Sequence, residues 1–280
     1  MTTAVCRVAP PIESPVVAQP TVASHTVAAR VVCRTGAALA VALAVSGCGA
    51  ASSDPGKEPT RRTVVVLAAS SLTESLTAIA EDFETSHGGT DIQLSFAASS
   101  TVVTQVNQGA PADLVALAGM SAAAPLDRRR VVGSTRSLAS NILEIATPPS
   151  NPGKVNTITD LSRPNLNVVL CAPTVPCGSA AAKALSLAGV AAHVVSYETD
   201  VKATLAKVQL GEADAAIVYH SDVVSAGARV RGVPIPASVN QTLDYPLILL
   251  TRDPTAVEFA TFLGTDQARK RLRDNGFLTP

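Results

Sequence analysis

The sequence predicts an α/β protein in which strands alternate with helices and the sheets are mostly parallel and covered on both faces. Two observations indicate this fold class. Short apolar runs rich in β-branched residues, typical of buried strands, recur along the chain. Between them lie stretches with apolar residues at helical spacing, several of which end at glycine. In such folds, ligands bind outside the carboxyl ends of the strands.

The composition leaves room for two domains and argues against some partners. The chain has 280 residues, 47% of them apolar and 16% charged, with zero net charge. Tryptophan is absent and aromatic residues make up 3%, which argues against stacking platforms for nucleic acids or sugars. The zero net charge provides no basic field for nucleic acid or anionic lipid, so no nucleic-acid partner is expected.

Residues 1–47 are expected to be a leader. The apolar run at residues 37–45 is too short to span a membrane but suits the core of a signal peptide. Small residues just before Cys48 resemble a bacterial lipobox, so Cys48 is the predicted lipidation site and first mature residue; the alternative is a short buried helix. Residues 48–62 are expected to form a flexible tether. Residues 1–32 are either a disordered extension or precede the true start of translation.

The first mature strand, residues 64–67, stops at two alanines and two hydroxyl residues, Ser70 and Ser71. A helix follows to residue 83, and Glu74 lies three residues past Ser71, where a capping box would place it. A buried strand that turns directly into a helix leaves unpaired N–H groups at the strand's carboxyl end. Such groups favour anions.

The same arrangement recurs further along the chain. A half-buried strand at residues 91–96 is followed by small residues, by hydroxyls that include Ser99, and by a helix at residues 102–108. The remaining predicted strands are residues 114–118, 141–147, 167–171, 194–197, 215–219, 233–239 and 245–250. The remaining predicted helices are residues 121–130, 158–161, 179–187, 201–210, a helix capped by Ser221 and Asp222, and residues 255–273.

Cys171 and Cys177 are the only cysteines after the leader and its Cys48. Two cysteines six residues apart in an exported protein predict a disulfide. Two free thiols are one alternative. A metal site is another, for which His193 is the only further candidate ligand nearby.

Four short motifs resemble, in order and spacing, the molybdate-binding proteins of ABC importers; they lie at residues 67–73, 96–101, 109–114 and 217–222. The resemblance extends from about residue 63 to the C-terminus, where residues 275–277 fit the end of the family. It implies a two-lobed, type II periplasmic-binding-protein fold with the ligand in the cleft between the lobes. Residues 63–140 plus 241–280 would form lobe 1, and residues 141–240 would form lobe 2.

The resemblance also implies the residues that bind the oxyanion: Ser71, Ser99, Cys177, Val201 and Tyr219. The two serines would each supply a hydroxyl and a backbone N–H, Cys177 and Val201 a backbone N–H, and Tyr219 its phenol. Val201 is matched by its spacing to Tyr219 more than by a motif. His220 stands where the family commonly has glycine, which leaves open whether its side chain crowds the cleft.

The chemistry of these positions suits a fully deprotonated oxyanion. Ser71, Ser99, Cys177 and Val201 fall at predicted helix starts, whose N–H groups and dipoles favour negative charge. The five positions supply donors and no carboxylate, so an anion that keeps a proton would have its O–H unpaired. Molybdate, tungstate and sulfate meet this condition, and the choice of molybdate over sulfate rests on the resemblance.

The sequence therefore predicts a monomeric, lipid-anchored, extracytoplasmic protein without cofactor or enzymatic activity. It would bind molybdate and tungstate and deliver the ion to an ABC permease and its ATPase. A sulfate or other oxyanion binder is the alternative within the same class. A serine hydrolase would need a base beside Ser71 or Ser99, and neither lies in a G-x-S-x-G elbow. An effector-sensing module of a regulator would not explain the leader.

Overall fold

The structure is a computed structural model that describes residues 62–280. The predicted leader, the predicted lipidation site Cys48 and the predicted tether up to residue 61 lie outside the described residues. Arg62, the last residue assigned to the tether, is instead the first residue of a strand. Within residues 62–280, no helix combines the length and the apolar character needed to cross a bilayer.

The first sheet is centred on β1 (Arg62–Ala69), which pairs in parallel with β2 (Thr90–Ala97) and β3 (Leu114–Ala116). The C-terminal strand β9 (Thr242–Leu249) pairs antiparallel with β3 and so brings a distant segment into this sheet. The helices of these segments are α1 (Thr73–Ser86), α2 (Ser99–Asn107), α3 (Met120–Ala123), α7 (Pro254–Phe262) and α8 (Asp266–Asp274).

The second sheet contains β5 (Val168–Cys171), which is parallel to both β6 (Val194–Glu198) and β7 (Ala215–Tyr219). The short strand β8 (Arg231–Pro234) completes it. Its helices are α4 (Pro176–Leu187), α5 (Val201–Gln209) and α6 (His220–Ala226). Single 3₁₀-helical turns lie at Ser70–Leu72, Arg128–Arg130, Ile158–Ser162 and Gly227–Arg229.

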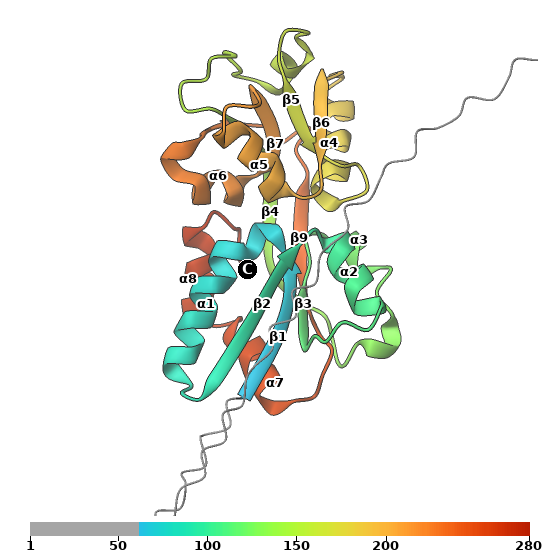
Figure 1. Ribbon diagram of the computed structural model, residues 1–280, viewed down its shortest axis with the longest axis vertical. Coiled ribbons are helices and arrows are strands. Elements are labelled where there is room, and N and C mark those ends of the chain that lie inside the picture. Colours follow the sequence, from blue (N-terminus) through green and yellow to red (C-terminus); the bar gives the residue numbers. More distant parts are fainter. Residues whose placement is uncertain (1–61) are drawn as a thin grey trace, which may run out of the picture. The chain divides into compact units, whose positions relative to one another are not determined.

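A single long strand, β4 (Arg136–Thr147), belongs to both sheets. Residues 136–142 pair antiparallel with β9, and residues 143–147 pair antiparallel with β7 and β8. The strand order is therefore β2-β1-β3-β9-β4-β7-β5-β6, with β8 on β4. Figure 1 shows β4 and β9 running between the group of β1, β2 and β3 and the group of β5, β6 and β7.

The apolar runs that predicted the strands are buried as expected. Val64 and Val66 of β1 have no exposed surface, and the helical spacing of residues 72–83 places Leu76, Ile79 and Phe83 of α1 in the core. Because β1 is covered on both faces, it holds the turn at Ser70–Leu72 in a fixed position at its carboxyl end. This edge of the sheet is where the candidate site lies.

The structure corrects several sequence-based expectations. The mostly parallel sheets are as predicted, with β4 and β9 running antiparallel to their neighbours, and the corrections concern the bounds of individual elements. The helix predicted at residues 121–130 ends at Ala123, just before Pro125, which has no N–H to donate. The helix predicted at residues 255–273 is divided at Gly264 into α7 and α8. The strand predicted at residues 233–239 ends at Pro234.

Candidate functional site

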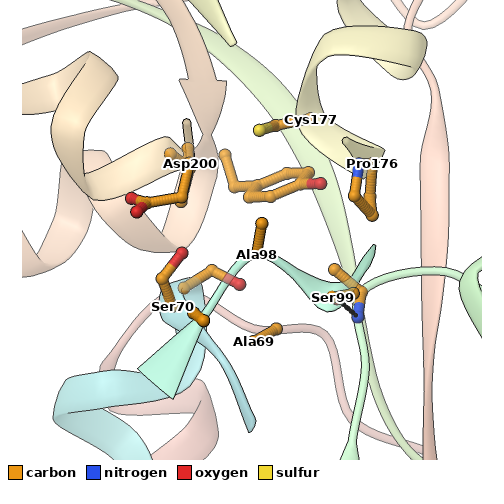
Figure 2. Close-up of a pocket in the computed structure, with 12 residues that line it drawn as sticks. Ala69, Ser70, Ala98, Ser99, Pro176, Cys177 and Asp200 are labelled. Carbon is orange, nitrogen blue, oxygen red and sulfur yellow. Dashed lines mark hydrogen bonds between the residues drawn. The ribbon is translucent and has the colours of Figure 1, made fainter. Parts of the chain in front are cut away.

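A cavity lies where several helix N-termini meet the carboxyl ends of strands from both sheets. The space inside it, counted together with the open solvent at its mouth, is about 210 Å³, of which about 10 Å³ can hold the centre of a water-sized sphere. All five residues singled out in the sequence line it: Ser71, Ser99, Cys177, Val201 and Tyr219. Figure 2 shows Ser70, Ala98 and Ser99 on one side of the cavity and Pro176, Cys177 and Asp200 on the other.

The topology explains why these residues meet. Strands β1 and β2 are parallel and end side by side at Ala69 and Ala97, so the turns that follow them face the same edge. Strands β5 and β7 do the same in the second sheet. The shared strand β4 places the two edges opposite each other. The first residues of α2 and α5, and the first turn of α4, therefore point N–H groups that have no intrahelical acceptor toward one space.

Ser71 does not cap α1, so the predicted capping box is wrong. The turn Ser70–Leu72 intervenes, α1 starts only at Thr73, and its N-cap residue Leu72 makes no side-chain cap. The Ser71 hydroxyl lies 2.9 Å from the Tyr245 hydroxyl instead. Ser70 also lines the cavity, a position that the motif match did not select.

Ser99 is positioned by the segment just after β3. Its Oγ accepts a hydrogen bond of 2.8 Å from the backbone N–H of Ala118, which itself lines the cavity. A serine hydroxyl that accepts from a backbone N–H keeps its own hydrogen available. Ser99 can therefore present both its O–H and its first-turn N–H to a ligand.

Cys177 is the second residue of α4 and forms a disulfide with Cys171, at the end of β5. The structure thus contradicts the alternative of two free thiols. Within residues 62–280, no group of three or more histidine, cysteine, aspartate or glutamate side chains could hold a metal ion. Gly178 is required beside this bond, because an added Cβ would overlap the backbone carbonyl of Ala172.

Val201 is the first residue of α5, and Asp200 is the N-cap. Asp200 Oδ1 accepts from the backbone N–H groups of Lys202 (2.8 Å) and Ala203 (3.0 Å) and leaves that of Val201 to the cavity. Asp200 also lines the cavity, so a carboxylate is present that the five predicted positions did not include. Aspartate directly before a helical run is a local N-cap signal, so the sequence around Val201 already contained the sign that would have placed Asp200 here.

Tyr219 ends β7 and is 2% exposed. Its hydroxyl is buried and has no hydrogen-bond partner within the described part of the chain. Burial raises the pKa of the Tyr219 hydroxyl well above its usual range, so the group stays protonated and can only donate to an anion. An unpaired buried hydroxyl costs about 1–3 kcal/mol. A polar group left in this state at a cavity indicates a ligand that accepts hydrogen bonds.

Comparison with known proteins identifies the family. Residues 64–278 match the model of a family described as bacterial extracellular solute-binding protein. The chain belongs to this family. It is 35% identical over 252 residues to the molybdate-binding protein ModA of Mycobacterium tuberculosis, an alignment that covers 86% of this chain and 97% of that protein.

Solved structures confirm the predicted fold of this solute-binding protein. The periplasmic molybdate-binding protein of Azotobacter vinelandii superposes with a TM-score of 0.69 at 19% identity, covering 78% of this chain and 99% of that one. The sulfate-binding protein SubI from Mycobacterium tuberculosis gives a TM-score of 0.68 at 20% identity, covering 77% and 86%. At these identities the likeness concerns the fold alone, which two proteins named for different oxyanions share.

Beside the cavity of this solute-binding protein lies a charged cluster formed by Glu74, Lys202 and Asp222. Lys202 Nζ is 2.7 Å from Glu74 Oε2 and 3.0 Å from Asp222 Oδ1. Burial raises the pKa of the Asp222 carboxyl, which has no exposed surface, although Lys202 opposes this effect. Burial would lower the pKa of Lys202, but Asp222 and Glu74 outweigh it and the pKa is raised. The charged cluster joins α1 to α5 and α6.

The histidines of this solute-binding protein that lie within residues 62–280 are engaged away from the cavity. His220 Nδ1 is 2.6 Å from Glu144 Oε2, and His220 is not among the residues that line the cavity. His87 lies against Phe83 and Glu258, and His193 contacts the backbone carbonyl of Leu166. None of the three histidines within residues 62–280 hydrogen-bonds to Ser71 or Ser99, so neither serine has a histidine beside it as the base of a nucleophile.

Proposed function

We propose that this solute-binding protein binds molybdate, and also tungstate, outside the cytoplasm and delivers the ion to an ABC permease and its ATPase. The observation that supports this most is the buried, unpartnered hydroxyl of Tyr219 at a cavity bordered by helix N-termini. Among the described residues that line the cavity, none is lysine, arginine or histidine. We therefore propose an anion held by neutral donors, with the Asp200 carboxylate occupied by the backbone N–H groups of Lys202 and Ala203.

The proposed ligand groups are the hydroxyls and backbone N–H groups of Ser71 and Ser99, the N–H groups of Cys177 and Val201, and the phenol of Tyr219. A hydrogen bond to a charged group contributes about 1.5–3 kcal/mol. Helix N-termini add about half a positive charge each, most strongly where water is excluded. Several such donors offset the burial of a double charge and leave a dissociation constant of about micromolar or lower.

The choice among tetrahedral dianions rests on relatives rather than on the cavity. The relative from Mycobacterium tuberculosis with 35% identity is named a molybdate-binding protein. The sulfate-binding SubI has the same fold at 20% identity. We therefore propose molybdate as the ligand, with sulfate as the alternative that a binding experiment must exclude.

We further propose that residues 63–140 plus 241–280 and residues 141–240 act as two lobes that close over the ion. The chain crosses between the sheets at β4 and again between β8 and β9, which suits a hinge of two connections. We propose that Cys48 is lipidated and anchors the protein, as a monomer, to the cell membrane. The apolar run and the small residues before Cys48 support this assignment.

Isothermal titration calorimetry of the purified protein with molybdate, tungstate, sulfate and phosphate tests the proposal. We expect saturable binding of molybdate and tungstate with a stoichiometry of one, and much weaker binding of sulfate and phosphate. Metal analysis of the protein purified without added anion gives an independent measure of molybdenum. Binding of sulfate alone would contradict the proposed ligand and leave the proposed mode of anion binding intact.

A further inference from the structure

Behind Ser71 lies a buried chain of hydrogen bonds that does not itself line the cavity. It runs from Asn141 in β4 to Tyr245 in β9 and on to Ser71 at the end of β1. Asn141 and Tyr245 have no exposed surface. Ser71 and Tyr245 are separated by 174 residues in sequence, so only the fold brings them together.

The orientation of the Asn141 amide is set by its backbone neighbours. Its Oδ1 accepts from the N–H groups of Ile142 (3.0 Å) and Ser221 (3.5 Å). The opposite orientation would turn the amide NH₂ toward these two donors. Asn141 Nδ2 therefore donates, to Ser221 Oγ at 2.7 Å and to the Tyr245 hydroxyl at 3.5 Å.

This orientation determines which way Tyr245 donates. The amide nitrogen of Asn141 has no lone pair that can accept a hydrogen bond, so the Tyr245 hydroxyl cannot donate to it. The Ser71 hydroxyl, at 2.9 Å, is its acceptor. Any other direction would leave a fully buried phenol hydrogen unpaired. Burial also raises the pKa of the Tyr245 hydroxyl, so this donor stays protonated.

We propose that Tyr245, oriented by Asn141, is a positioning residue that makes Ser71 donate its hydroxyl hydrogen into the cavity. This inference rests on the proposed function and deepens it by naming a determinant of ligand class. Because Tyr245 occupies one of the two acceptor lone pairs of Ser71 and turns the serine's own hydrogen toward the cavity, Ser71 faces the ligand as a donor. An oxyanion that keeps a proton is disfavoured at this position, and a fully deprotonated one is accepted.

The variant Tyr245→Phe removes the donor and keeps the ring that packs on Tyr219 and Phe277, with centroids 6.2 Å and 5.3 Å away. Without the Tyr245 hydroxyl, the Ser71 lone pair that had accepted its hydrogen bond becomes free to accept one from the O–H of hydrogen phosphate. We expect the affinity for molybdate to fall about threefold to tenfold and the preference for molybdate over hydrogen phosphate to fall by a similar factor. Tyr197→Phe, at a largely exposed tyrosine of β6, is the matched control and should change neither.

The experiment is competition calorimetry at mildly alkaline pH with molybdate, sulfate and hydrogen phosphate, on the wild type, Tyr245→Phe, Ser71→Ala and the double variant. In the Ser71→Ala background, Tyr245→Phe should no longer change the preference, because Tyr245 acts through Ser71. Thermal unfolding reports whether each variant folds. If Tyr245→Phe does not fold, Asn141→Ala replaces it and should lower the preference in the same direction.

An equal loss of affinity for all three anions would assign Tyr245 a purely structural role and overturn the inference. An unchanged preference in a folded variant would do the same. A wild type that binds none of the anions would overturn the proposed function as well. Strong binding by the wild type with an unchanged preference in the variant would overturn this inference alone.

Discussion

The cavity and the charged cluster beside it are built on opposite principles, although both join the two sheets. The described residues around the cavity offer neutral donors, and one of these, the Tyr219 hydroxyl, is left without a partner. In the charged cluster of Glu74, Lys202 and Asp222, the opposite charges are paired within the protein, although Asp222 Oδ1, 3.0 Å from Lys202 Nζ, accepts no hydrogen bond in the described part of the chain. The cavity therefore keeps an unpaired donor that a ligand can use. The ion pairs of the charged cluster contribute instead to the stability of the fold. Substitutions in the two regions should affect different measurements.

The largest expected effect is on stability, from Lys202→Met. Asp222 would stay fully buried without its counter-ion, so we expect the free energy of unfolding to fall by about 3–5 kcal/mol. The matched control is Lys207→Met on the same helix, whose partner Glu212 is exposed, and we expect no measurable change in stability there. Urea denaturation of both variants measures the difference. Equal, small losses would show that the cluster does not support the fold.

The same variant should show a defined pH dependence. The folded-state pKa of Asp222 is raised by burial, and removal of Lys202 raises it further, so the protonated form is favoured in the folded protein. Stability of Lys202→Met should therefore be lost as the pH rises from about 3.8 through the raised pKa. In the wild type, the raised pKa of Lys202 contributes stability that is present below 10.5 and lost above it. Denaturation at several pH values checks both trends.

Tyr219→Phe should affect binding and leave folding intact. The variant loses one hydrogen bond to the anion, so we expect the dissociation constant for molybdate to rise about tenfold to a hundredfold. The ligand-free protein should be as stable as the wild type or more stable by about 1 kcal/mol, because an unpaired buried hydroxyl is removed. Calorimetry and thermal unfolding without ligand test the two halves of this prediction. A large loss of stability without ligand would show that the hydroxyl has a partner inside the protein.

Removal of the disulfide should reduce stability less than Lys202→Met does and should reduce affinity less than Tyr219→Phe does. Replacement of both Cys171 and Cys177 by alanine removes a short cross-link, so we expect a loss of about 2 kcal/mol in the free energy of unfolding. The backbone N–H of residue 177 remains at the start of α4, so the affinity for molybdate should change by less than about threefold. Parallel denaturation and calorimetry check this. A loss of affinity as large as that of Tyr219→Phe would mean that the bond itself shapes the cavity.

Much of this arrangement was accessible from sequence because its signals are local. A buried strand, small residues, hydroxyls and a helix follow one another directly at Ser71 and Ser99, and the structure brings both serines to one cavity. The match to a family's order of motifs added Cys177, Val201 and Tyr219. The structure places these three at the same cavity.

The parts that sequence did not reveal depend on long-range packing. Tyr245 meets Ser71 only because β9 returns beside β3 and β4. The pairing of Glu74 with Lys202 replaced the capping box that the local pattern predicted, since a tertiary contact outweighed a local one. The break at Gly264 between α7 and α8 was hidden by apolar residues that continue at helical spacing on both sides.

Glu74→Gln should give the smallest effect and would sharpen the comparison. Glu74 is partly exposed, and Lys202 keeps its pairing with Asp222 in the variant, so we expect a stability change below about 1 kcal/mol. Glu74 on α1, beside the first sheet, bonds Lys202 on α5, beside the second sheet. Because the cavity lies between these two parts, loss of this ion pair should lower the affinity for molybdate about twofold to threefold. The difference from wild type should shrink at high salt, which screens exposed ion pairs. Calorimetry at two salt concentrations measures this.

The most direct test of the account is the crystal structure of the protein with molybdate, with anomalous data collected at the molybdenum absorption edge. The account predicts one strong anomalous peak in the cavity. The anion's oxygens should lie within hydrogen-bond distance of the hydroxyls of Ser71, Ser99 and Tyr219 and of the backbone N–H groups of Cys177 and Val201. A peak elsewhere in a protein that binds molybdate in solution, or an anion held by lysine or arginine side chains, would contradict it.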